Sequence, residues 1–206
     1  MSVLDGIKKC LDVHKGHLTF GEGTYVDHEG VQLLILPGMF ILAGSNEAVD
    51  WYRNFDVFLA PGDSLGVGKV HRGFKRCAEK VWQHIKNSIV EEDAVTFYGH
   101  SQGGCVASLL ALLYKNTYPN SRVTIVTYGS PAFVSSEFKK NFEGIMYTRF
   151  INSYDIVSSL PCIPIYKHPV EGIRLGLSGV LGRIRTLLSP IKTHWHISYI
   201  KELEKW

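Results

Sequence analysis

The sequence predicts an α/β protein in which helices cover both faces of a mainly parallel central sheet. Short runs rich in β-branched and aromatic residues alternate along the chain with longer stretches of helical periodicity. The composition, 45% hydrophobic and 20% charged over 206 residues, is typical of a folded globular protein. No internal repeat or Pro/Ser-rich linker interrupts the first 168 residues, so we expect a single domain over residues 1–206.

The first half of the chain contains two predicted strands and one predicted helix. Apolar runs at 31–36 and 39–43 are separated by the turn dipeptide Pro37-Gly38, which predicts two buried strands with a tight connection. From Phe74 onward, apolar residues recur at intervals of three and four, the spacing of a helix that packs on a sheet. We expect this helix to end near residues 87–90.

The second half repeats the alternation of strand and helix. Residues 94–98, 123–128 and 147–151 are short β-branched or aromatic runs and are predicted as strands. The almost uniformly apolar stretch 105–114 is too long for a strand and predicts a buried helix. Residues 135–142 are expected to form a short surface helix.

A glycine-rich motif lies between the predicted strand at 94–98 and the helix that follows it. Gly99-His100-Ser101-Gln102-Gly103-Gly104 matches G-x-S-x-G, the nucleophile elbow of α/β-hydrolases. The serine of such an elbow occupies a strained turn, and the flanking glycines let the neighbouring backbone pass without Cβ clashes. The motif in this context predicts the α/β-hydrolase fold, with Ser101 as nucleophile.

The partners of Ser101 are expected downstream, because α/β-hydrolases order their triad as serine, acid and histidine along the chain. Asp155 fits the acid best, since it follows the strand predicted at 147–151 in a loop at a strand end. Three downstream histidines, His168, His194 and His196, are candidates for the base. The residue pattern does not choose among them.

Several motifs together show a family resemblance that runs from about Val31 to Tyr199. The chain resembles the class 3 lipases, the fungal lipase-like family, in motifs that occur in the family's order. They are Ala43-Gly44-Ser45 with a tryptophan-bearing segment after it, Val70-His71-Arg72-Gly73-Phe74, the elbow, Gly129-Ser130-Pro131, the loop from Asp155 to Pro161, and His196-Ile197-Ser198-Tyr199.

The resemblance implies roles for individual residues. The family's His-x-x-Tyr motif favours His196 as general base over His194, for which we expect a supporting or surface role. The oxyanion hole would be formed by the backbone N–H groups of Ser45 and Gln102, with the Ser45 hydroxyl. Gln102 replaces the family's leucine but acts through its main chain. Ala43 replaces the family's arginine, a charged side chain that would tie down neighbouring backbone.

Other histidines are expected to be structural. His168 is predicted to lie in a core strand, and structural roles are favoured for His71 and His100.

Two further segments bear on the substrate. The resemblance implies a lid over residues 46–55, whose apolar side chains Val49, Trp51 and Phe55 would cover the site in water and face lipid when open. We hypothesise interfacial activation on this basis. Residues 171–192 mix leucines with arginines and suit an anionic membrane surface, but an insertion that covers the acyl pocket or contacts a partner explains them equally well.

The composition argues against several other classes of protein. The net charge of +3 is scattered, which gives no reason to expect nucleic acid as a partner. No cluster has metal-ligand spacing and no phosphate-binding loop is present, so we expect no metal and no cofactor. The four cysteines are predicted to be free thiols. Without a visible export signal or membrane span, the protein is expected to be cytoplasmic, with peripheral contact to a lipid interface as an option.

These observations predict a lipase or carboxylesterase that hydrolyses fatty-acyl ester bonds of an acylglycerol or phospholipid through a Ser-His-Asp triad and an acyl-enzyme. An acyltransferase that uses the same triad is one alternative. A non-catalytic lipid-binding or interaction protein with a lipase-like fold is another, and a complete set of triad residues argues against it.

Overall fold

The computed structural model describes residues 1–16, 23–44, 58–153, 155–176 and 194–206. Its centre is a seven-stranded sheet of strand order β1-β2-β3-β6-β7-β8-β9. The first three strands pair antiparallel, and all pairings from β3 to β9 are parallel. The strands are β1 (Thr24–His28), β2 (Val31–Leu36), β3 (Met39–Leu42), β6 (Ala94–His100), β7 (Arg122–Tyr128), β8 (Met146–Asn152) and β9 (Ile173–Leu175), with a separate ribbon of β4 (Leu59–Pro61) and β5 (Lys69–His71).

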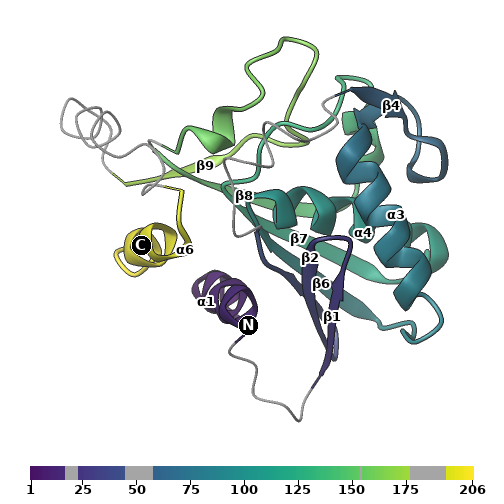
Figure 1. Cartoon of the computed structure of the whole chain (residues 1–206), viewed down its shortest axis with the longest axis horizontal. Helices are drawn as coiled ribbons and strands as arrows, with labels where there is room; N and C mark the ends of the chain where they lie inside the picture. Colours follow the sequence, from purple (N-terminus) through teal and green to yellow (C-terminus); the bar gives the residue numbers. More distant parts are fainter. Residues whose placement is uncertain (17–22, 45–57, 154, 177–193) are drawn as a thin grey trace.

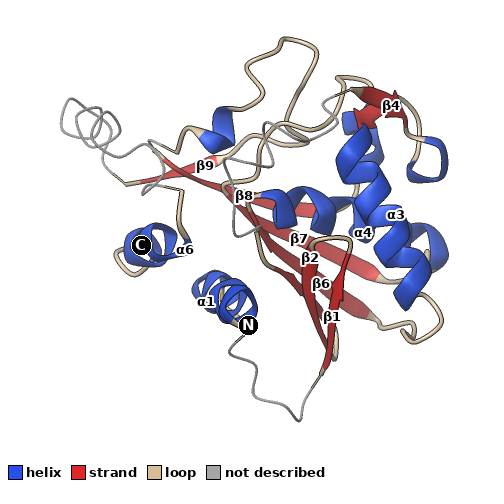
Figure 2. Cartoon of the chain, in the orientation of Figure 1, coloured by secondary structure: helices blue, strands red, loops and turns tan. Residues whose placement is uncertain are grey.

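Helices cover both faces of the sheet, as Figures 1 and 2 show. The helices α3 (Arg72–Ile85) and α4 (Gln102–Thr117) lie on one face, and α1 (Val3–Lys15) and α6 (His196–Leu203) lie side by side on the other. Three short 3₁₀ helices lie in the connections: η1 (Asp63–Leu65), η2 (Phe138–Phe142) and η3 (Val157–Ser159). The predicted α/β architecture with a mainly parallel sheet is confirmed.

The central strands are buried on both faces, which is why they read as almost continuous apolar runs. Because side chains alternate along a strand, Phe40 and Leu42 of β3 join the apolar cluster under α3 and α4. Ile41, between them, joins a second cluster that contains residues of α1 and α6. The sheet is therefore held between two apolar layers.

The five predicted strands are present, each within two residues of its expected bounds. The helix expected from Phe74 is α3, and it ends at Ile85, because the chain turns through 86–88 directly after it. The short surface helix expected at 135–142 is reduced to η2. Several described elements were not predicted: the strands β1, β4, β5 and β9, the helices α1 and α6, and the short 3₁₀ helices η1 and η3.

Helix α1 has local signals at both ends. Ser2 and Asp5 form a capping box, in which the Ser2 hydroxyl accepts the Asp5 N–H and the Asp5 carboxylate accepts the Ser2 N–H. Gly16 ends the helix in the left-handed conformation, at φ 67°. These signals fix α1 at 3–15.

Two further sequence expectations are addressed by the described part of the chain. All four cysteines are free thiols, as predicted. Among the described residues, no helix has the length and apolar character needed to cross a membrane.

Candidate active site

Ser101 lies at the sharp turn between β6 and α4, with φ 55° and ψ −127°. A methyl group at Gly99 would lie 2.4 Å from the Gly103 carbonyl oxygen, and one at Gly103 would lie 2.3 Å from the Ala43 carbonyl oxygen. No side chain fits at either position, so the glycine spacing of the motif is a steric requirement of this turn. The turn is the strained elbow that the sequence predicts.

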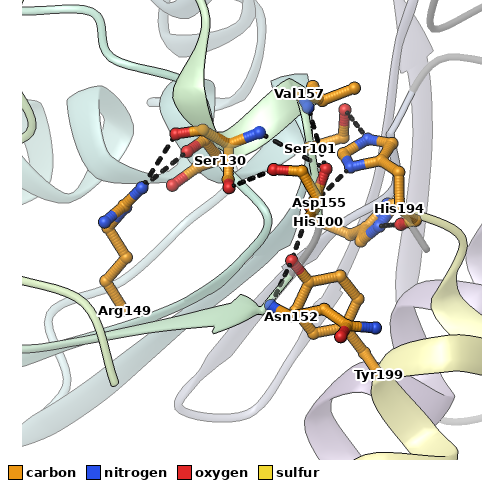
Figure 3. Close-up of polar contacts among 10 residues, drawn as sticks. His100, Ser101, Ser130, Arg149, Asn152, Asp155, Val157, His194 and Tyr199 are labelled. Atoms are coloured by element: carbon orange, nitrogen blue, oxygen red, sulfur yellow. Dashed lines mark hydrogen bonds and ion pairs between the residues drawn. The ribbon is translucent and has the colours of Figure 1, made fainter. Parts of the chain in front are cut away.

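His194 connects Ser101 to Asp155, as Figure 3 shows. Its Nε2 lies 2.7 Å from Ser101 Oγ, and its Nδ1 lies 2.8 Å from Asp155 Oδ2. Because a carboxylate only accepts hydrogen bonds, Nδ1 carries the proton and Nε2 accepts from the Ser101 hydroxyl. The three side chains come from the elbow, the loop after β8 and the segment before α6, and they form the geometry of a nucleophile with its general base.

The prediction of His196 as the base is wrong in this structure. His196 is the first residue of α6, and its ring packs 3.8 Å from the His100 ring and 5.0 Å from the His14 ring. Among the described residues, neither of its ring nitrogens has a hydrogen-bond partner. Burial lowers the pKa of His196 to about 3, so the ring is neutral at physiological pH.

The physical reason lies in where α6 begins. His196 and Tyr199 are three residues apart within the helix and lie on its buried face. The tyrosine reaches Asp155 from this face, but the histidine that reaches Ser101 precedes the helix. His194 therefore has the contacts that the family motif suggested for His196.

Among the described residues, four donors bond to the buried Asp155 carboxylate. Oδ1 accepts the N–H groups of Val157 (2.9 Å) and Ser158 (3.4 Å). Oδ2 accepts His194 Nδ1 and the hydroxyl of Tyr199, the latter over 2.6 Å. This set of donors fixes the direction of the carboxylate.

Arg149, which lies on β8, links two loops behind the site. Its Nη2 donates to the carbonyl oxygen of Ser158, 3.1 Å away, and to that of Ser130, 3.5 Å away, in the Gly129-Ser130-Pro131 loop (Figure 3). The same nitrogen lies 3.1 Å from Nε2 of His168. Burial and the positive charge of Arg149 lower the pKa of His168 to about 3, so it stays neutral. His168 follows an isolated β-bridge at Lys167 and is not in a strand, contrary to the prediction.

Residues 39–164, more than half of the chain, match the sequence model of the Lipase (class 3) family. The chain belongs to this family. It is 32% identical over 125 residues to secreted mono- and diacylglycerol lipase 3 of Gibberella zeae, an alignment of 54% of this chain and 39% of that protein. It is 26% identical over 118 residues to the chloroplastic phospholipase A(1) DAD1 of Arabidopsis thaliana, covering 56% of this chain and 26% of that one. The chain thus spans well under half the length of these two relatives.

The architecture of this chain is similar to that of a solved fungal enzyme. The triacylglyceride lipase of Rhizomucor miehei superposes with a TM-score of 0.64 over 84% of this chain and 77% of that chain, at 19% sequence identity. The likeness shows that the chain has the α/β-hydrolase fold, as the sequence predicts.

The residues predicted to form the oxyanion hole are only partly described. Gln102 is the first residue of α4, where backbone N–H groups lack intrahelical partners and favour negative charge. Ser45 and the lid residues Val49, Trp51 and Phe55 lie outside the described residues, as does most of 171–192. Gly44, directly before Ser45, packs on the elbow: a methyl group there would lie 3.0 Å from Ser101 Cβ.

Two histidines have the structural roles that the sequence favours. His100 Nε2 donates to the carbonyl oxygen of His194 over 2.7 Å, which fixes the backbone of that residue. Burial holds the pKa of His100 well below its usual value. His71 caps α3, with its Nδ1 accepting the Phe74 N–H over 3.3 Å.

Proposed function

We propose that this protein is a serine esterase that hydrolyses fatty-acyl ester bonds of a lipid, either an acylglycerol or a phospholipid. The observation that carries the proposal is the continuous hydrogen-bonded chain from Ser101 through His194 to Asp155, with links of 2.7 and 2.8 Å. Membership of the class 3 lipase family supports the ester as the bond attacked.

Acylation follows from this geometry. Ser101 Oγ attacks the ester carbonyl carbon while His194 Nε2 takes the hydroxyl proton, and Asp155 stabilises the resulting imidazolium. The negative charge on the carbonyl oxygen is stabilised by the N–H groups of Gln102 and Ser45 and by the Ser45 hydroxyl, as the family resemblance implies. When the tetrahedral intermediate collapses, the imidazolium gives its proton to the leaving alcohol.

Deacylation uses the same groups with water as the nucleophile. His194 takes a proton from the water as it attacks the acyl-enzyme, and then returns this proton to Ser101 Oγ. The fatty acid leaves and the free serine is restored. An acyltransferase would differ only in the alcohol that replaces water, so the ratio of free fatty acid to transferred acyl product distinguishes the two activities.

The substrate class rests on the relatives. One is named as a mono- and diacylglycerol lipase and the other as a phospholipase A(1). Both kinds of lipid offer the same acyl ester carbonyl, and the alcohol part decides between them. We propose hydrolysis of a glycerolipid ester at a lipid interface, which assays on diacylglycerol and phosphatidylcholine dispersions would resolve.

Each step of this chemistry is performed by protein side chains and main chain. We therefore propose that neither a metal ion nor a cofactor takes part, and we expect full activity in the presence of a chelator.

A cytoplasmic location stays a prediction, since the Gibberella zeae relative is named as secreted. Fractionation of cells that express the full-length protein would test it.

The deciding experiment compares wild type with Ser101→Ala on p-nitrophenyl esters of graded chain length, with covalent labelling by a fluorophosphonate. Hydrolysis and labelling that are both lost in the variant would support the proposal and give the acyl preference. An inert, unlabelled wild type would instead favour the non-catalytic lipid-binding alternative.

A further inference from the structure

The N-terminal helix α1 contacts the loop that leads into the oxyanion region. His14, in the last turn of α1, places Nδ1 3.2 Å from the carbonyl oxygen of Gly44. A carbonyl oxygen only accepts, so Nδ1 carries the proton and donates it. Figure 1 shows α1 next to α6, on the face of the sheet opposite α3 and α4.

The Gly44 carbonyl shares a peptide group with the next N–H along the chain. A peptide group is planar and almost always trans, so its C=O and N–H bonds point in opposite directions. The N–H that follows Gly44 belongs to Ser45, the proposed oxyanion donor. A donor that holds the Gly44 oxygen therefore restrains the plane of this peptide group, and it also polarises the amide.

The position of Gly44 makes this direction important. Its Cα packs against the elbow, so closely that an added methyl group would lie 3.0 Å from both Ser101 Cβ and His100 Nδ1. A rotation of the Gly44 peptide plane would occur beside the nucleophile itself.

The loop has no polar side chain of its own at position 43. Ala43 is buried, and its N–H donates to the Gln32 carbonyl oxygen over 3.0 Å as the strand ends. That bond holds the peptide before Ala43, whereas the Gly44 carbonyl oxygen, one peptide further on, accepts from His14.

The His14 ring is held by two aromatic neighbours from the segment that carries His194. Trp195 presents a near-perpendicular contact with a centroid distance of 6.1 Å, and the His196 ring lies 5.0 Å away. The start of α1 is anchored too, since the hydroxyls of Tyr98 and Tyr128 donate to the carbonyl oxygens of Met1 and Val3. His14 thus connects the general-base segment to the oxyanion loop through a fixed helix.

We propose that His14 is a positioning residue that orients the oxyanion-loop peptide of this esterase from α1. The inference rests on the proposed function, because the oriented N–H matters only if Ser101 forms a tetrahedral intermediate. It also assigns a role to the buried His196, whose ring packs against the partly buried His14 ring.

Two variants separate the hydrogen bond from the ring packing. His14→Phe keeps an aromatic ring against Trp195 and His196 but cannot donate. His14→Asn loses the ring but keeps a donor, because the amide nitrogen of asparagine is as many covalent bonds from Cα as Nδ1 of histidine. Lys15→Ala, at an exposed neighbouring position of α1, is the matched control.

The measurements are kcat and KM on a short soluble ester, the affinity for an alkyl boronic acid, and the thermal midpoint of each variant. Loss of a whole oxyanion donor costs about 10²–10³ in rate, so a misdirected donor should cost about tenfold. We expect His14→Phe to lower kcat and weaken boronate binding by about tenfold at nearly unchanged KM, because the boronate adduct on Ser101 uses the oxyanion hole. His14→Asn should recover most of this loss.

The possible results are distinguishable. A His14→Phe variant with wild-type kcat and boronate affinity, or equal losses in His14→Phe and His14→Asn, would overturn the positioning role. Losses that follow the thermal midpoint alone would overturn it as well, by reducing His14 to a packing residue. A wild type without esterase activity or fluorophosphonate labelling would refute the proposed function itself, independently of these variants.

Discussion

The Tyr199 hydroxyl donates to Oδ2 of Asp155 over 2.6 Å, and this is the carboxylate oxygen that also accepts Nδ1 of His194. The same hydroxyl accepts the Asn152 N–H over 3.0 Å. Burial, together with the charge of Asp155, raises the pKa of Tyr199 well above its usual value. The tyrosine thus stays protonated, and it ties the acid of the triad to both α6 and the end of β8.

Tyr199→Phe is expected to lower kcat about tenfold and the free energy of unfolding by about 2 kcal/mol. The variant keeps the buried ring but removes a donor to a charged group, which contributes roughly 1.5–3 kcal/mol, and it leaves the Asn152 N–H without this acceptor. Ester hydrolysis and urea unfolding of the purified variant give the two quantities. Wild-type values of both would show that the other donors suffice to hold Asp155.

The two histidines of the His194-Trp195-His196 segment should differ sharply on substitution. His194→Asn removes the general base and is expected to lower kcat/KM by about 10⁴-fold. His196→Asn should stay within about tenfold of wild type, because the ring contacts that the described residues make with His196 come from His14 and His100. Steady-state kinetics on one p-nitrophenyl ester decide between them, with circular dichroism as the control for folding. A larger loss in His196→Asn would restore the assignment that the sequence favoured.

The fold and the elbow could be predicted from sequence because their signals are local. Strand runs bounded by turns, helical periodicity and the glycines around Ser101 reflect sterics within a few residues. Asp155 could also be predicted from sequence, since it follows a predicted strand.

The general base could not be identified from the local sequence pattern. His194 and His196 are two residues apart, and which one faces Ser101 depends on where α6 begins after a long connection. The spacing of three residues to Tyr199 pointed to His196, but the tyrosine acts from inside the helix and the base from before it. Helix α1 had a readable capping box, yet its link to Gly44 joins residues 30 positions apart, and no sequence pattern indicates such a contact.

Acid should destabilise the fold as the pH falls from about 6.5 toward 3. His100, His168 and His196 have pKa values lowered by burial, those of His168 and His196 to about 3. In this window the unfolded chain binds protons that the folded protein does not, so the free energy of unfolding decreases as the pH decreases. Each such histidine contributes up to about 1.4 kcal/mol per pH unit.

His196→Leu tests this effect at one site. It removes a buried ring whose two nitrogens lack hydrogen-bond partners among the described residues, so stability at pH 7 should stay near that of wild type. Its unfolding free energy should fall less steeply between pH 6 and 4, by up to about 1.4 kcal/mol per pH unit. Urea unfolding at three pH values measures the slope. Parallel curves for variant and wild type would mean that His196 is not kept neutral by the fold.

Access to Ser101 is expected to limit the rate in water. Ser101 is 1% exposed and His194 is 3% exposed, so an acyl chain cannot reach the hydroxyl in this conformation. If a lipid interface favours an open state, hydrolysis of tributyrin should rise abruptly once the ester exceeds its solubility and forms an emulsion. The rate of fluorophosphonate labelling should also rise when micelles are added, and this second measurement separates opening of the site from simple enrichment of substrate at the interface. Labelling that is indifferent to micelles, with hydrolysis that saturates smoothly across the solubility limit, would mean that the site opens equally well in water.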